Sequence, residues 1–202
     1  ILSGVKTNKL KFGGGLEKDE YRRLCDAVNY ASSLPIYIDS TNIVKASALG
    51  LRLNGLHSSD NGPVWMMSVD YLELLARSEH TKESKEQAVE EVTRQCQIFS
   101  RDTSSCVVLI SQSTQDSGKF QIAGADGTRY SRGIYMTADA VCEVWNPVFM
   151  KKALIRFEIP EGLNDSQPFM LIEKDREMGI SPPVGLGWEP EYRRFRDPAL
   201  PD

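Results

Sequence analysis

Two apolar runs on either side of one long helical pattern constrain the fold of this chain more than any other feature. The run Val64–Val69 is broken only by Ser68 and ends at Asp70, and Cys106–Gln112 is a second run of the same kind. Between them, residues 82–101 place apolar side chains on one side of a helix and charged side chains on the other. Continuous apolar runs of this kind are typical of strands buried on both faces of a parallel sheet. We therefore expect an α/β sheet with helices on both faces.

The segments before and after this unit extend the pattern and then change its character. Residues 16–33 have a helical period, Ile36–Asp39 predicts a short strand, and a second helix is expected from Thr41 to about Leu56. Asp139–Trp145 predicts another strand, after which short strands alternate with Gly/Pro turns. These last strands are Ala153–Ile159, Phe169–Glu173 and a weaker Val184–Trp188. The expected sheet is therefore mostly parallel, with an antiparallel carboxyl-terminal extension.

Length and composition limit the class of protein. The 202 residues correspond to one domain or most of one. No apolar run approaches the roughly eighteen residues that a membrane span needs, so no membrane association is expected. The net charge of −4 means that any nucleic acid would be bound by a local basic patch. The chain starts at Ile1 without a Met or a signal peptide, which suggests a piece of a longer protein.

The cysteines favour an intracellular protein without a zinc site. There are four, with no C-x-x-C motif and only two histidines to join them, so zinc binding is not expected. The four are Cys25, Cys96, Cys106 and Cys142. Cys96 and Cys106 fall within apolar patterns and are expected to be small core residues. This usage fits a reducing compartment, and we expect a cytoplasmic protein.

Polar residues stand at the ends of both apolar runs. In open α/β sheets, ligands bind beyond the carboxyl ends of the parallel strands, which is where Asp70 and Gln112 are expected. A carboxylate there can hold the magnesium of a nucleotide through water, and an amide can sense a terminal phosphate or an attacking water. Taken singly, Asp70 is more often a turn residue and Gln112 the start of a loop. Together, on strands separated by one amphipathic helix, they indicate a RecA-like ATPase core.

Several strings also carry a resemblance to a known family. Three occur in order at suitable spacing: Ile36-Tyr37-Ile38-Asp39-Ser40, Ser68-Val69-Asp70-Tyr71-Leu72-Glu73-Leu74 and Val108-Leu109-Ile110-Ser111-Gln112. Two more are Ile172-Glu173-Lys174-Asp175-Arg176 and Tyr192-Arg193-Arg194-Phe195. Over nearly the whole chain, this series resembles the carboxyl-terminal motor domain of DnaB-type replicative helicases. Identity between the strings is weak.

The resemblance implies roles for four residues. Asp70 matches the family's Walker B aspartate, which holds Mg²⁺ through water, and Gln112 matches the motif that couples nucleotide to DNA. Arg176 matches the arginine finger that reaches the neighbouring subunit's ATP, with Lys174 beside it. A finger of this kind stabilises negative charge that grows in the transition state. Without the resemblance, Lys174 and Arg176 are better interpreted as a solvated strand end.

The polar, Gly-rich stretch 113–133 is long for a loop in a compact domain, and such loops are usually functional or disordered. The resemblance implies that this loop touches single-stranded DNA in the channel of a hexamer. The residues expected to contact it are Lys119, Arg129, Tyr130 and Arg132. Cations suit phosphates, and an aromatic ring can stack on a base. A disordered surface segment is an equally good interpretation, and Arg77–Lys85 is a second candidate for a channel loop.

No phosphate-binding motif G-x-x-x-x-G-K-[ST] occurs in these 202 residues. Gly4-Val5-Lys6-Thr7 partly matches the end of this motif, but Val5 stands at the position where the motif needs a glycine to cradle the phosphates. The resemblance places the phosphate loop and the catalytic glutamate upstream, and Ile1-Leu2-Ser3-Gly4 resembles the helix that follows that glutamate. We therefore expect residues 1–202 to be a single RecA-like ATPase domain that is incomplete at its amino-terminal side.

Three functions are compatible with the sequence. The resemblance implies ATP- and Mg²⁺-dependent unwinding and translocation on single-stranded DNA by a hexameric ring, with a primase or a helicase loader as a further partner. As it stands, this chain is expected to be inactive alone. The alternative is a catalytically silent RecA-like interaction module without ATP turnover. A different RecA-like ATPase, such as a recombinase, is a third interpretation, which the Asp-Tyr-Leu-x-Leu string and the Lys-x-Arg hairpin oppose.

Overall fold

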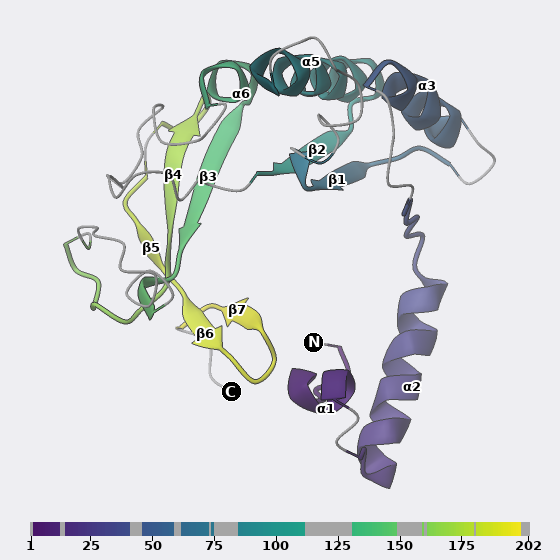
Figure 1. Ribbon diagram of the computed structural model, residues 1–202, viewed down its shortest axis with the longest axis vertical. Coiled ribbons are helices and arrows are strands. Elements are labelled where there is room, and N and C mark those ends of the chain that lie inside the picture. Colours follow the sequence, from purple (N-terminus) through teal and green to yellow (C-terminus); the bar gives the residue numbers. More distant parts are fainter. Residues whose placement is uncertain are drawn as a thin grey trace.

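The computed structural model describes residues 2–12, 15–40, 46–58, 62–72, 74, 85–111, 131–148, 159, 161–179 and 181–198. Figure 1 shows these parts as an open arc, with α3, α5 and α6 along one side and the strands beneath and beside them. The helices are α1 (Thr7–Phe12), α2 (Lys18–Ser33), α3 (Ala46–His57), α5 (Lys85–Thr103) and α6 (Ser131–Thr137). The strands are β1 (Met66–Asp70), β2 (Cys106–Ile110), β3 (Ala140–Trp145), β4 (Phe169–Asp175), β5 (Val184–Gly185), β6 (Gly187–Glu189) and β7 (Arg194–Arg196).

The two central apolar runs form the expected parallel pair. β1 and β2 run side by side in a register that pairs Met66 with Cys106 and Asp70 with Ile110. Helix α5 connects them along the chain, because a parallel pair needs a crossover long enough to return to the same end of the sheet. The parallel β–α–β unit predicted from the sequence is confirmed.

Helices α3 and α5 cover one face of this pair and form the main core with it. The α5 side chains of Val92, Cys96 and Phe99 are exposed by only 1–2%. Leu53 of α3 and Leu72, just after β1, complete the cluster, and partly buried side chains of β1 and β2 pack against it. Those strand residues are Met67, Val107 and Leu109. Burying an apolar side chain of this size contributes about 1.5–3 kcal/mol each, so this cluster anchors the β1–β2 pair to its helices.

The opposite face of the β1–β2 pair is open. The exposed fraction is 62% for Met66, 37% for Val108 and 43% for Ile110, and burial alternates along β2. The prediction of strands buried on both faces is therefore wrong for the part of the chain that the structure describes, and no second helical layer covers this face there. The apolar run correctly indicates that both faces of the β1–β2 pair are apolar. It does not indicate whether a neighbouring element covers the face opposite α3 and α5.

The carboxyl-terminal half is antiparallel, as predicted. β3, β4 and β5 form one sheet in that order, with a register shift between Val141 and Cys142, and β6 and β7 form a separate hairpin. A small core holds this sheet, in which the rings of Trp145 and Phe169 stack with their centroids 6.2 Å apart. Of the strand expected at 153–159, all but the last residue lies outside the described residues.

Four local expectations need correction. The segment Ile36–Asp39 is not a strand, and Ile38 is 87% exposed, because none of the described strands pairs with it. Cys96 is buried as expected, but Cys106 at the start of β2 faces the open side and is exposed. The helix expected at the very start is found instead at α1, and the end of the expected polar loop 113–133 forms α6.

All four cysteines are free thiols. Among the described residues, no helix combines the length and the apolar character that a bilayer crossing would require.

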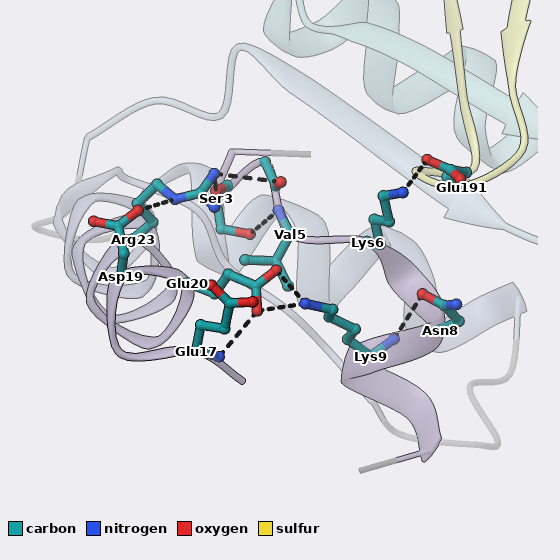
Figure 2. A network of polar contacts seen from close by, with 11 residues as sticks. Ser3, Val5, Lys6, Asn8, Lys9, Glu17, Asp19, Glu20, Arg23 and Glu191 are labelled. Carbon is teal, nitrogen blue, oxygen red and sulfur yellow. Dashed lines mark hydrogen bonds and ion pairs between the residues drawn. The ribbon is translucent and has the colours of Figure 1, made fainter. Parts of the chain in front are cut away.

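Polar contacts tie α2 to the amino-terminal segment and that segment to the carboxyl-terminal hairpin, as Figure 2 shows. Lys9 Nζ lies 2.6 Å from Glu20 Oε1, and Arg23 Nη1 donates to the carbonyl of Ser3 at 3.2 Å. Lys6 Nζ lies 2.7 Å from Glu191 Oε2, and the Thr7 backbone N–H donates to the Glu191 carbonyl at 2.8 Å. The two ends of the chain therefore lie side by side.

Candidate functional site

Asp70 is presented at the carboxyl end of the parallel pair. It is the last residue of β1, opposite the last residue of β2, Ile110, and its side chain is exposed. The Asp70–Tyr71 peptide bond is cis, and Leu72 immediately after it is fully buried in the core under α5. Within the part of the chain that the structure describes, the Asp70 carboxylate makes no hydrogen bond or ion pair. The exposed Asp70 carboxylate thus lies two residues before a side chain that is buried in the core.

Gln112 lies outside the described residues. The register nevertheless brings the strand that leads to it, β2, to the same edge as Asp70, because Ile110 pairs with Asp70. Ser111, the residue between Ile110 and Gln112, is exposed at that edge. The role of Gln112 stays a prediction.

Arg176 follows β4 directly and is held by three hydrogen bonds. Its guanidinium donates from Nη1 to Asp139 Oδ1 at 2.9 Å and from Nη2 to the carbonyl of Met136 at 2.8 Å. Its backbone N–H donates to the carbonyl of Asp139 at 3.0 Å. The side chain remains 44% exposed, so the guanidinium is anchored and still reachable.

Lys174, near the end of β4, contacts the same end of α6 as Arg176 does. Its ammonium donates to the carbonyl of Tyr135 and lies 5.1 Å from the centre of the Tyr135 ring. Partial burial lowers the pKa of Lys174 below its ordinary value, the Arg176 charge lowers it further, and Asp139 opposes both. The last carbonyls of a helix lack partners within the helix and carry partial negative charge, which explains why both cations collect there.

The structure therefore brings Lys174 and Arg176 together and leaves Asp70 apart from them. Among the described residues, no hydrogen bond or ion pair links Asp70 to either cation, and they belong to different sheets. Three of the four residues predicted to contact DNA lie outside the described residues: Lys119, Arg129 and Tyr130. Arg132 lies in the first turn of α6, and its side chain is not among those described.

The comparison with protein families decides the identity of this fold. Residues 1–197 match the DnaB-like helicase C-terminal domain family. The chain belongs to that family.

Individual DnaB-like proteins agree with this assignment. The replicative DNA helicase DnaB of Synechocystis is 30% identical over 108 residues, which is 54% of this chain and 12% of that protein. The replicative DNA helicase DnaC of Bacillus subtilis is 25% identical over 184 residues, covering 90% of this chain and 38% of that protein. A solved DnaB-like replicative helicase, described with its interactions with primase, superposes with a TM-score of 0.77 at 16% identity over 96% of this chain and 46% of that one. The chain thus spans less than half of each of these relatives.

The DnaB-like family uses ATP, and the described residues fit one part of a magnesium–nucleotide site. An exposed carboxylate at the end of a buried-face strand, as at Asp70, suits a hydrated Mg²⁺, which keeps several of its own waters and needs few protein ligands. No group of three or more His, Cys, Asp or Glu side chains that could enclose a metal is found among the described residues. The sequence holds no G-x-x-x-x-G-K-[ST] motif of the kind that cradles phosphates.

Asp139 and the last turn of α6 are the part of the site that sequence reasoning missed. Asp139 and Arg176 lie 37 positions apart, and no motif spacing connects them. Asp139 was expected only as the first residue of a strand. The one feature of the sequence that could have indicated a role for Asp139 is its position between a short apolar stretch, which forms part of α6, and the strand β3. Their meeting depends on the pairing of β3 with β4, which brings Ala140 opposite Asp175.

Proposed function

We propose that this chain is part of the ATP-driven motor of a hexameric replicative DNA helicase, which translocates on single-stranded DNA and unwinds the duplex. The observation that carries the proposal is the family match over residues 1–197. The parallel β1–β2 pair supports it, because that pair presents Asp70 at the edge where α/β sheets bind ligands. Relatives named replicative DNA helicases align over 90% of this chain, which extends the support to most of its length.

In this proposal, residues 1–202 form one RecA-like domain together with a phosphate-binding segment that these residues do not contain. The sequence has no G-x-x-x-x-G-K-[ST] motif. Among the described residues, β2 pairs only with β1, and β3 pairs only with β4, so each strand leaves one edge open. The exposed apolar side chains on the open face of β1 and β2 support the same conclusion, because sheet edges are normally paired and apolar sheet faces are normally covered. In the complete protein, a further strand would pair with an open edge.

Bound Mg²⁺–ATP would supply the phosphoryl transfer that drives movement, and four side chains of this chain would act on bound nucleotide. Asp70 would hold the hydrated metal through its carboxylate, and Gln112 would orient the attacking water or sense the terminal phosphate. Arg176, with Lys174 beside it, would reach the nucleotide of the neighbouring subunit and stabilise the charge that grows in the transition state. Arginine fingers of this kind increase turnover by about 10³–10⁵-fold.

The same proposal assigns single-stranded DNA to residues 113–130 together with the first turn of α6. Lys119, Arg129 and Arg132 would contact phosphates, and Tyr130 would stack on a base. A primase or a helicase loader would be a further partner of the assembled ring.

A second candidate function is a RecA-like interaction module that assembles on DNA or on a partner without turning over ATP. The absence of a phosphate-loop motif from these 202 residues is the observation that favours it. The two candidates differ in one measurable property, which is ATP hydrolysis by the complete protein.

The decisive experiment measures Mg²⁺-dependent ATP hydrolysis and forked-DNA unwinding by the complete protein, with Asp70→Asn and Arg176→Ala as variants. A helicase should turn over ATP, and Arg176→Ala should lose at least about 10³-fold in turnover while it retains nucleotide binding. Asp70→Asn should lower the Mg²⁺-dependent turnover, because the variant removes the charge that faces the metal. A complete protein that binds DNA but hydrolyses no ATP would establish the interaction module instead.

The DNA contact has its own test. Arg129→Ala combined with Arg132→Ala should weaken single-strand binding and flatten its salt dependence, because each lost phosphate contact removes about 0.7 from the slope of log affinity against log salt. Asp26→Asn, on the exposed side of α2, is a control that should leave both quantities as they are. An unchanged affinity and slope in the double variant would remove the loop from the proposed interface.

A further inference from the structure

The last turn of α6 is used in an unusual way: each of three successive carbonyls accepts a hydrogen bond from a side chain of another element. The carbonyl of Tyr135 accepts from Lys174, that of Met136 from Arg176 at 2.8 Å, and that of Thr137 from Gln97 at 3.1 Å. Such carbonyls have no partners within their own helix. Here β4 and α5 supply them.

We propose that Asp139 and the last turn of α6 form a positioning clamp for the Arg176 guanidinium. The clamp fixes which of the guanidinium's donors remain available to a phosphate of the neighbouring subunit's nucleotide. The inference rests on the proposed function, since it concerns how the finger is aimed and not whether Arg176 is one.

The geometry of the guanidinium supports a positioning role. The group is a planar fork of five donors, so fixing two of its nitrogens fixes the direction of all the others. Nη1 and Nη2 are both occupied, by Asp139 Oδ1 at 2.9 Å and by the Met136 carbonyl at 2.8 Å. The side chain is still 44% exposed, so the guanidinium remains within reach of a ligand.

The clamp is itself rigidly supported, as a positioning element must be. The Tyr135 hydroxyl donates to the carbonyl of Glu173 at 3.1 Å, which binds α6 to β4 immediately before Lys174. On the other side, α6 packs so closely on α5 that a Cβ at Gly133 would lie 2.6 Å from Cγ of Glu90. Helix α6 is therefore fastened to the strand that carries Arg176 and to the helix of the main core.

Asp139 is the part of the clamp that a substitution can remove without disturbing the helix. Its side chain is 82% exposed, and its carboxylate bonds Arg176 while its backbone carbonyl accepts the Arg176 N–H. Replacing the Asp139 side chain leaves two hydrogen bonds in place, from the Arg176 N–H to the Asp139 carbonyl and from Arg176 Nη2 to the Met136 carbonyl. An exposed ion pair contributes little to stability, so any large loss of activity must come from the orientation of the guanidinium.

The experiment measures the steady-state ATPase of the complete, assembled protein for Asp139→Ala and Asp139→Asn. Asp139→Ala should lower kcat about tenfold with KM for ATP unchanged, because a misplaced group loses transition-state stabilisation and not ground-state binding. Asp139→Asn keeps an acceptor oxygen for Nη1 and should recover most of the lost kcat. Asp19→Ala is the matched control, since Asp19 also pairs with arginines on an exposed surface of α2 and should leave kcat unaltered.

A double-mutant cycle separates this inference from the proposed function. If Asp139 acts through Arg176, then Asp139→Ala should cost nothing further in an Arg176→Ala background. An equal loss in both backgrounds, an unchanged kcat in Asp139→Ala, or a change in KM alone would each overturn the clamp while Arg176 keeps its role. Full activity of Arg176→Ala would overturn the finger itself. If Asp139→Ala fails to assemble, Asp139→Leu, which keeps the approximate size of the side chain but removes both acceptor oxygens, decides the question in both backgrounds by the same criteria.

Discussion

The two longest helices of this protein share a pattern and differ in what that pattern achieves. Helix α5 has 19 residues and α2 has 16, and both are amphipathic. On α5 the apolar side is buried against the β1–β2 pair, with Val92 and Phe99 exposed by 1% and 2%. On α2 no residue is buried, and Val28 and Tyr30 are exposed by 55% and 57%. An amphipathic pattern thus predicts a helix and its apolar side, but not whether another element covers that side.

The two helices are consequently held by different forces. Helix α5 is held by apolar burial, which is insensitive to salt and to moderate changes of pH. Helix α2 is held by charged and backbone contacts to the amino-terminal segment, such as Lys9–Glu20 and Arg23 to the carbonyl of Ser3 (Figure 2). The Lys9–Glu20 ion pair is only partly buried, so it is screened by salt and titrates with its carboxylate. Substitutions and solution conditions should therefore separate the two helices clearly.

The largest effect is expected for Phe99→Ala on α5. Phe99 is 2% exposed in the main core, and its removal should lower the free energy of unfolding by about 3–5 kcal/mol through lost burial and a cavity. Tyr30→Ala on α2 is the matched aromatic control and should change the same quantity by no more than about 0.5 kcal/mol. Urea unfolding monitored by circular dichroism measures both. Similar losses for the two variants would mean that α2 is packed as firmly as α5.

This contrast also shows how far the sequence predicts the structure. Helix α5 and strands β1 and β2 were placed within a few residues, because period and run length report local conformation directly. The strand expected at Ile36–Asp39 was wrong, because a strand exists only where a neighbour accepts and donates its hydrogen bonds. The exposure of Cys106 was missed for a similar reason, because the burial of a side chain depends on which element packs against it and not only on the apolar run that contains it.

The candidate site divides in the same way. Asp70 could be placed at a strand end because that position is local to one segment. Asp139 could not be connected with Arg176, because the contact arises only when β3 pairs with β4 and α6 packs beside them. The parts of a site that one segment determines can be predicted, and the parts that depend on long-range pairing cannot.

A second, smaller effect concerns the thiol of Cys96 in the α5 core. Burial raises the pKa of Cys96 from 9.0 to about 12. Because the folded pKa is the higher one, the native state holds its proton more tightly, and this contribution is complete below pH 9.0 and lost as pH rises toward about 12. At pH 9, iodoacetamide should modify the exposed Cys106 and Cys142 in the folded protein but not Cys96. Rapid labelling of Cys96 without unfolding would show that the α5 core is open.

A third effect should appear on α2 alone when the pH falls. The hydrogen bond from Lys9 and the backbone contact with Glu17 lower the pKa of Glu20 below its ordinary value. A lowered folded pKa means that the stabilisation is present above the ordinary value of 4.5 and is lost as pH falls through the folded pKa. The protection of the α2 amides against hydrogen exchange should therefore fall on acidification before that of the α5 amides does. Glu20→Gln should remove this pH dependence, whereas Asp26→Asn on the same helix should preserve it.

The sharpest test of the comparison comes from one pair of valines. Val92→Ala on α5 should cost about 1.5–3 kcal/mol of unfolding free energy, because Val92 is 1% exposed. Val28→Ala on α2 should cost nothing and can even stabilise, because Val28 is 55% exposed and alanine has the higher helix propensity. Both substitutions remove the same two methyl groups from a helix, so propensity cancels between them and the difference measures burial alone. A loss of more than about 1 kcal/mol of unfolding free energy for Val28→Ala would show that another surface covers the apolar side of α2. The two helices would then not differ in burial.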